Sequence, residues 1–342
     1  MKSQDIIDYG NLPQPDRDHY GFLEDLKKPM EYSLPKGHGC DAGELCNALA
    51  GGVSLQNEAL APRTALVSLR RLFKERNILE GPGGYRISFR LEGTFQKEEY
   101  AIETGKNGAD VTAGDVEGFR RATYHLAELI AQAEGKSIMP GSWRRRPFVR
   151  RRISRCFFGP TNRAPYFIDE LMNNVDYYPE NYLDKLAREG VNGLWLTMYF
   201  RDLSSSVFPG RGANAEKRLA KLRRTVARCA EYGIKIYVFT SEPKYFGPDS
   251  FAVDLNDAEG VSGVVAQKID AWHRFCVGSE NGRRYLQECV ETLFSAVPGL
   301  GGLINIMSGE DTAEVTCFMD KAQMRTLLDE LTALCEKFPD RP

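Results

Sequence analysis

The chain has 342 residues, of which 42% are hydrophobic and 27% are charged, a composition typical of a globular protein. Its formal net charge of −2 gives no reason to expect binding to nucleic acid or to a membrane surface. No run approaches the ~18 apolar residues that a transmembrane helix requires. Residues 1–15 lack the basic-then-apolar pattern of a signal peptide, and we therefore expect a cytoplasmic protein.

The eight cysteines are dispersed along the chain, and no two of them form a Cys-x-x-Cys pair. This spacing indicates reduced thiols, most of them in the core. His38, Cys40 and Cys46 lie close together in the sequence, but their spacing matches no zinc motif. We therefore predict no metal site and no cofactor.

The first half of the chain predicts an irregular segment followed by a small domain. Residues 1–61 show no long period and are expected to be irregular. Residues 62–142 predict a small α+β domain, in which Asp115 caps the second helix. Its elements are a helix over 62–74, strands over 85–90, 99–103 and 109–112, and a helix over 116–133.

The second half repeats one pattern three times, in which a helix ends near a glycine and a buried strand follows. The helices cover 179–189, 215–232 and 282–296, and the strands cover 191–198, 234–239 and 303–307. A strand over 153–158 precedes them, and a helix over 322–338 follows. Such alternation predicts an α/β fold with a parallel sheet and right-handed crossovers.

Two parallel architectures fit this alternation. A doubly wound sheet usually carries a glycine-rich phosphate loop after its first strand, and none is present here. A (β/α) barrel of TIM type places polar residues after every strand, as this sequence does, and is favoured. Because an eight-stranded barrel takes ~250 residues, residues 143–342 predict only its first half, about four βα units, as a catalytic domain.

The strongest candidate site follows the fourth strand of this series, where Ser308-Gly309 leads into Glu310 and Asp311. The carboxyl ends of parallel strands are where catalytic groups usually lie. A carboxyl group there could act as a general acid if burial or a like charge raises its pKa. The alternative is that Ser308, Glu310 or Asp311 opens a helix at Thr312.

Two further candidates follow the other predicted strands. Glu242 could line the same mouth, or it could be a loop carboxylate. Tyr199, with Arg201, could hold sugar hydroxyls, but a surface pair of Arg201 with Asp202 is the alternative. No Ser/His/Asp or Cys/His arrangement is indicated by the spacing, and His125 is expected at a surface or interface.

A run of arginines separates the two predicted domains. It could bind phosphate or nucleic acid, but the rest of the chain is acidic, and a junction in which these side chains pair with carboxylates is favoured. Arg152 and Arg155 lie where the first strand begins and could point into a site. The run comprises Arg144, Arg145, Arg146, Arg150, Arg151, Arg152 and Arg155.

The order of these parts resembles glycoside hydrolase family 20 and its relatives. The residues that carry the resemblance are Glu-Glu-Tyr-Ala-Ile-Glu at 98–103, the Gly-x-x-x-Gly-x-x-x-Ala-x-x-x-Leu pattern at 114–126, Pro-Phe-x-Arg-Arg-Arg-Ile at 147–153, and the helix and strand at 182–196. The resemblance implies that residues 62–142 form a zincin-like domain without a metal. It also implies a following (β/α) barrel that carries the active site.

In that family a Gly-Gly-Asp-Glu motif ends the fourth strand. Its Asp positions the substrate acetamido group, which is the nucleophile, and its Glu is the general acid. The matching residues here are Glu310 and Asp311, with the two acids in reverse order. The family also binds sugar hydroxyls with an arginine at the first strand, and Arg152 is the nearest counterpart.

We therefore predict a glycoside hydrolase that acts on the O-glycosidic bonds of a carbohydrate, with an N-acetylhexosaminide as one candidate, by carboxylate acid catalysis. Glu310 and Asp311 are the predicted catalytic residues, and Arg152, Tyr199 and Glu242 are predicted to bind substrate. The alternative is a non-catalytic carbohydrate-binding or structural remnant. Half a barrel would leave two open sheet edges, through which the chain could form a homo-oligomer.

Overall fold

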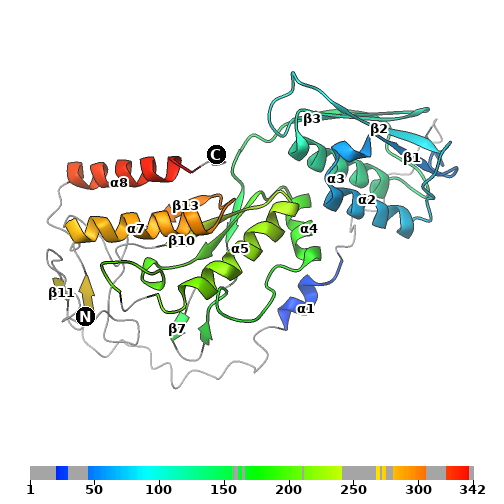
Figure 1. The fold of residues 1–342 in the computed structure, drawn as a ribbon. Helices are drawn as coiled ribbons and strands as arrows, with labels where there is room; N and C mark the ends of the chain where they lie inside the picture. The colour runs from blue at the N-terminus through cyan, green and yellow to red at the C-terminus, as the bar shows by residue number, and fades with distance from the viewer. Residues whose placement is uncertain are drawn as a thin grey trace.

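The computed structural model describes the chain in two main parts, each built on its own hydrophobic core (Figure 1). One core is formed by residues 49–138, and the other mostly by residues after 170. In the described residues, no helix is both long enough and apolar enough to cross a membrane. The described residues are 21–29, 45–155, 157, 161–163, 166–209, 212–240, 267–269, 272–274, 280–305 and 321–338.

The first part is a five-stranded mixed sheet with two helices, α2 (Arg63–Glu75) and α3 (Val116–Gln132), on one face (Figure 1). The strand order is β1-β2-β4-β3-β5. Strands β1, β2 and β4 are parallel, and β3 is antiparallel to both β4 and β5. The strands are β1 (Val53–Gln56), β2 (Tyr85–Leu91), β3 (Tyr100–Gly105), β4 (Gly108–Ala113) and β5 (Gly141–Arg145).

Local sequence explains these elements. In β2, Tyr85, Ile87 and Phe89 are buried, while the residues between them are half-buried, as alternation in a strand with one wet face requires. Asp115 caps α3 as predicted, because its carboxylate accepts a hydrogen bond of 2.7 Å from the Gly118 amide. Gly118 itself packs so closely that a Cβ there would lie 2.7 Å from the Glu99 carbonyl oxygen.

Two strands of this sheet were not predicted from the sequence. Strand β1 lies within residues 1–61, which were expected to be irregular, and it pairs in parallel with β2. Strand β5 contains the predicted domain boundary at residues 142 and 143, and it pairs with β3 from Tyr100 to Thr104. Both are short edge strands, and edge strands carry a weak sequence signal because one side and one face are exposed.

The second part contains a four-stranded sheet in which every strand is parallel to its neighbours. The strand order β6-β9-β10-β13 follows the order of the chain. Its strands are β6 (Ile153–Arg155), β9 (Gly193–Thr197), β10 (Lys235–Thr240) and β13 (Gly302–Asn305). Its helices are α4 (Glu180–Arg188), α5 (Ala215–Glu231), α7 (Glu280–Ala296) and α8 (Lys321–Glu336), and α8 lies alongside α7 (Figure 1).

These elements confirm a mixed α/β fold, and the predicted helices and strands agree with the observed ones to within a few residues. The closure of these strands into part of a barrel stays a prediction. Three smaller features complete the described chain, which are helix α1 (Phe22–Leu26) and two hairpins, β7–β8 (Thr161–Arg163 and Tyr166–Ile168) and β11–β12 (Gln267–Ile269 and Trp272–Arg274).

The two faces of the four-stranded sheet differ. Leu194, Leu196, Ile236 and Val238 alternate along β9 and β10 and are fully buried in the core beside the helices. The residues between them point to the other face of the sheet. On that face the Tyr237 ring of β10 packs against Gly193 of β9. A Cβ on the glycine that begins β9 would lie 2.9 Å from that ring, so glycine is required there.

The two parts are joined by a buried carboxylate, Asp184 on α4. Its side chain accepts hydrogen bonds from Tyr124 on α3 at 3.0 Å and from Arg71 on α2 at 3.1 Å. Ser68 on α2 and Arg188 on α4 lie at 3.4 and 3.3 Å. Asp184 is therefore surrounded by donors from three helices. The pKa of Tyr124 is raised above its usual value, mainly by burial and secondly by the negative charge of Asp184.

A second junction lies where the chain passes between the parts. Arg152 donates to Glu98 at 2.5 Å, and Asn192 lies 3.4 Å from the same carboxylate. Arg144 pairs with Glu99 at 2.8 Å. Members of the arginine run therefore pair with carboxylates at the junction, as the sequence predicted.

Replacing Asp184 by Asn should lower the free energy of unfolding by about 3–5 kcal/mol, because the half-buried Arg71 and the buried Arg188 guanidinium groups would lose their shared counter-charge. Urea unfolding followed by circular dichroism measures this. Asp110→Asn is the matched control, since Asp110 forms an exposed ion pair with Arg86 and should cost about 0–1 kcal/mol. Equal losses in the two variants would contradict the assigned role of Asp184.

His125 predicts a pH dependence of stability. It is buried, whereas a surface or interface position was expected. Its Nδ1 lies 3.1 Å from the Tyr100 hydroxyl, and burial lowers its pKa to about 4. In the unfolded chain the histidine pKa is near 6.5, so as the pH falls the unfolded chain is protonated at a higher pH than the folded protein. Stability that is full above pH ~6.5 should therefore fall by up to about 3 kcal/mol as the pH drops to ~4.

The comparison of wild type with His125→Gln isolates this contribution, because glutamine does not titrate. Urea unfolding between pH ~7 and ~4 should show the wild type losing more stability than the variant. Parallel pH profiles for the two proteins would show that His125 is not held neutral by the fold.

Candidate functional site

The carboxyl ends of three parallel strands lie at one edge of the four-stranded sheet. Thr197 ends β9, Thr240 ends β10 and Asn305 ends β13, and Thr240 and Asn305 are register partners. Glu242 follows β10 shortly after its end, and Glu310 and Asp311 follow β13. These three predicted site residues lie outside the described residues, so their roles stay predictions.

Tyr199 lies at the same edge, directly before a short 3₁₀ helix, η4 (Phe200–Asp202). Its side chain is half-buried. The Asp202 side chain is about nine-tenths buried and lies 3.9 Å from Arg218 of α5. Arg218 in turn pairs with Asp169. Asp169, which follows β8, and Asp202, which ends η4, thus both lie close to the Arg218 guanidinium.

The structure identifies an acidic pair that the sequence reasoning passed over. Asp169 and Glu170 directly follow strand β8, and Glu170 is 4% exposed and accepts a 2.8 Å hydrogen bond from the Tyr178 hydroxyl. The signal was of the same kind as that used for Glu310 and Asp311, namely two acids after a short apolar strand. It was missed because β8 has only three residues.

An aromatic surface lies on the face of the sheet opposite the helices. The rings of Trp195 and Phe239, on adjacent strands, are 4.2 Å apart. The Arg155 guanidinium lies 5.3 Å from the centre of the Trp195 ring, within the range of a cation–π contact. Arg155 was predicted as one of two arginines that could point into a site, whereas both aromatic residues were treated only as strand positions.

Arg152 lies at the other end of its strand, just before β6 begins. Its guanidinium donates to Glu98, to the Gly190 carbonyl and to the Val149 carbonyl, at 2.5 to 2.7 Å. These contacts occupy it at the junction between the two parts. The structure thus gives Arg152 a positioning role at the junction, and its role in substrate binding stays a prediction.

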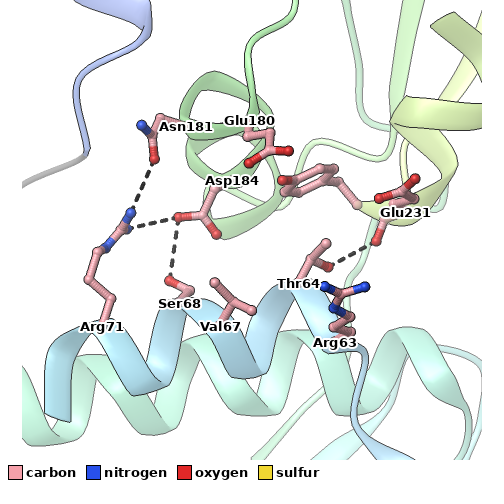
Figure 2. Close-up of a pocket in the computed structure, with 10 residues that line it drawn as sticks. Arg63, Thr64, Val67, Ser68, Arg71, Glu180, Asn181, Asp184 and Glu231 are labelled. Carbon is pink, nitrogen blue, oxygen red and sulfur yellow. Dashed lines mark hydrogen bonds and ion pairs between the residues drawn. The ribbon is translucent and has the colours of Figure 1, made fainter. Parts of the chain in front are cut away.

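A pocket of about 630 Å³ lies between the two parts, away from this edge (Figure 2). Side chains of α2 face α4 and the end of α5 across it, and a dashed line marks the Thr64 hydroxyl donating to the Glu231 carbonyl at 2.9 Å. Its lining residues are Arg63, Thr64, Val67, Ser68, Arg71, Glu180, Asn181, Asp184, Glu231 and Tyr232.

The sequence alone matches no family model and no curated protein. Solved structures match it at low identity. A family 138 glycoside hydrolase that targets the pectin rhamnogalacturonan II superposes with a TM-score of 0.52 at 17% identity, over 74% of this chain and 30% of that chain. The N-acetyl-β-hexosaminidase of Streptomyces plicatus gives a TM-score of 0.51 at 18% identity, over 85% of this chain and 60% of that chain.

The family 20 exo-β-N-acetylglucosaminidase of Vibrio harveyi gives a TM-score of 0.50 at 15% identity, over 82% of this chain and 46% of that chain. This chain therefore spans between 30% and 60% of the length of these three structures. Identities this low show similarity of fold alone. At that level the predicted resemblance is confirmed, because the α/β fold is similar to that of family 20 glycoside hydrolases.

Proposed function

We propose that the chain is a glycoside hydrolase that cleaves O-glycosidic bonds of a carbohydrate at the carboxyl edge of its four-stranded sheet. The observation that carries the proposal is the all-parallel sheet with strands in chain order, found in a chain whose fold is similar to glycoside hydrolases of two families. Parallel strands present their carboxyl ends, and therefore the following loops, at one edge.

In this proposal the four strands are the first half of a (β/α) barrel within residues 143–342, and residues 62–142 are a zincin-like domain beside it. The chain-order sheet supports the barrel, because each new strand is added at the same side. A doubly wound sheet would instead reverse its strand order at a switch point.

The proposed catalytic groups are Glu310 and Asp311, with Glu242 and Tyr199 binding substrate. Glycosidic cleavage needs a protonated carboxyl group beside the leaving oxygen. Glu310 follows β13 at this edge in the sequence, which supports it in that role.

The aromatic surface supports a carbohydrate substrate. Sites for small ligands combine apolar and aromatic walls with a few polar groups, and Trp195 and Phe239 supply such a wall beside Arg155. Two of the similar structures are β-N-acetylhexosaminidases or β-N-acetylglucosaminidases. An N-acetylhexosaminide is accordingly the first substrate to test.

A non-catalytic, carbohydrate-binding protein of the same fold is the second candidate. It is favoured by the order of the acids, Glu310 before Asp311, which is the reverse of the family pattern. In this case the aromatic surface would bind sugar without cleaving it. The outer strands β6 and β13, each paired on one side in the described residues, would be available for pairing with a second copy.

Glu310→Gln should abolish hydrolysis of aryl N-acetyl-β-glucosaminides and related aryl glycosides, because the amide cannot donate the catalytic proton. The loss should be at least about 100-fold in kcat, the scale of general acid catalysis. Glu336→Gln, which changes an exposed carboxylate at the end of α8, is the control and should keep full activity. Wild-type activity in Glu310→Gln would refute the site assignment.

Solution size together with activity separates the two candidates. A hydrolase should turn over at least one aryl glycoside, whatever its oligomeric state in light scattering. A monodisperse protein that binds N-acetylglucosamine in calorimetry and cleaves none of the aryl glycosides would establish the binding protein instead. Light scattering of that protein would also show whether two copies associate, since a dimer has twice the mass.

A further inference from the structure

The four strands of the parallel sheet carry basic residues and no acidic ones. Arg155 ends β6 and Lys235 begins β10, whereas neither aspartate nor glutamate occurs in β6, β9, β10 or β13. Two carboxylates that follow strands, Asp169 after β8 and Asp202 after β9, already lie close to Arg218. The charged side chains of the sheet itself are therefore all positive.

Arg155 lies at the carboxyl end of its strand, beside the aromatic surface. It is the register partner of Trp195, so both side chains point to the same face of the sheet. The guanidinium carbon lies 5.3 Å from the centre of the Trp195 ring, and the centres of the Trp195 and Phe239 rings are 4.2 Å apart. Because Arg155 is exposed, a ligand can reach this group of one cation and two aromatic rings.

The guanidinium of Arg155 forms no ion pair with a carboxylate in the part of the chain that the structure describes. Arg152, three residues earlier, is paired with Glu98. A contact with the face of an aromatic ring holds an arginine in place. The N–H groups lie in the plane of the guanidinium and can donate two parallel hydrogen bonds to a carboxylate or a sulfate. Arg155 is therefore positioned to bind an anionic group beside the aromatic rings.

A second guanidinium lies near the same face of the sheet. Burial raises the pKa of Tyr237, and the charge and hydrogen bond of Arg151 act in the opposite direction, so Arg151 lies close to the Tyr237 hydroxyl. Arg151 precedes β6, whereas Arg155 ends it. Positive charge is thus present toward both ends of the aromatic face, and the summed field attracts an anionic ligand.

We propose that the sugar bound at this edge carries an acidic group, either a carboxylate or a sulfate ester, and that Arg155 selects it. The sugar ring would stack on Trp195 and Phe239, while its acidic group accepts hydrogen bonds from the Arg155 guanidinium. A uronic acid and a sulfated N-acetylhexosamine both meet this requirement. The inference rests on the proposed function, because it names the class of carbohydrate that the same site would take.

Calorimetric titration of the full chain with matched sugars tests the proposal. Methyl β-glucuronide and N-acetylglucosamine 6-sulfate are the acidic sugars, and methyl β-glucoside and N-acetylglucosamine are their neutral counterparts. At least one acidic sugar should bind about tenfold more tightly than its counterpart, the scale of one charge-assisted pair, and salt should weaken this preference. The sugar that shows the preference identifies the recognised group as carboxylate or sulfate. Inorganic sulfate that binds as tightly as the preferred acidic sugar would show an anion site without sugar recognition, and would overturn the proposal.

Variants assign the preference to one side chain. Arg155→Gln should lower the affinity for the acidic sugar about tenfold and change that for the neutral sugar less than about twofold. Arg150→Gln is the matched control, since Arg150 is an exposed arginine of the same run that lies before β6 rather than at its end, and it should keep the preference. Trp195→Ala should weaken both sugars, because it removes the aromatic wall. Circular dichroism checks that each variant is folded.

The results distinguish this inference from the proposed function. Equal binding of acidic and neutral sugars, or a preference that persists in Arg155→Gln, would overturn the inference and leave sugar binding at this edge in place. No binding of any of these sugars, together with no cleavage of their aryl glycosides, would refute the proposed function as well.

Discussion

The buried charge of Asp184 is the constraint that joins the two parts of this protein. A carboxylate this far from water must be surrounded by donors, and those donors come from α2, α3 and α4. Because the donors belong to both hydrophobic cores, neither part can shift without uncovering the charge. The Arg152–Glu98 contact adds a second connection where the chain passes between the two parts.

The carboxyl ends of the four-stranded sheet lie away from this junction. Strands in chain order place Thr197, Thr240 and Asn305 at one edge, and the predicted catalytic acids follow directly in the sequence. The helix-facing side of the same strands is filled with fully buried aliphatic residues, whereas the opposite side carries Trp195 and Phe239. The core and the proposed sugar-binding surface thus lie on different faces of one sheet.

The sequence predicted the long, strongly periodic elements and missed the short ones. Helix α3 and its Asp115 cap, and the three helix-glycine-strand repeats, were predicted because their periodicity and end signals agree. Strands β1, β5 and β8 are short or lie at edges, where few residues carry the pattern. Asp184 accepts from Arg71, which is 113 positions away, and His125 contacts Tyr100, which is 25 positions away. No local sequence pattern reveals such contacts.

The candidate site divides in the same way. Acids placed after a strand can be read from the sequence, and this reading identified Glu310 and Asp311 and, by the same rule, would have identified Asp169 and Glu170. The proximity of two carboxylates to Arg218 and the contact of Arg155 with Trp195 arise from segments that meet only in the folded chain. Resemblance of sequence order predicted a fold similar to that of family 20 glycoside hydrolases, and the superposition with solved structures confirmed this similarity of the α/β fold.

Amide hydrogen exchange with and without N-acetylglucosamine tests the central claim, that a sugar binds at the carboxyl edge of the four-stranded sheet. The account predicts that sugar slows exchange in peptides that cover the ends of β9, β10 and β13 and the loops that follow them. Exchange in α2 and α4, around the separate pocket, should not change. Protection confined to α2 and α4, or no protection in any peptide at saturating sugar, would contradict the account.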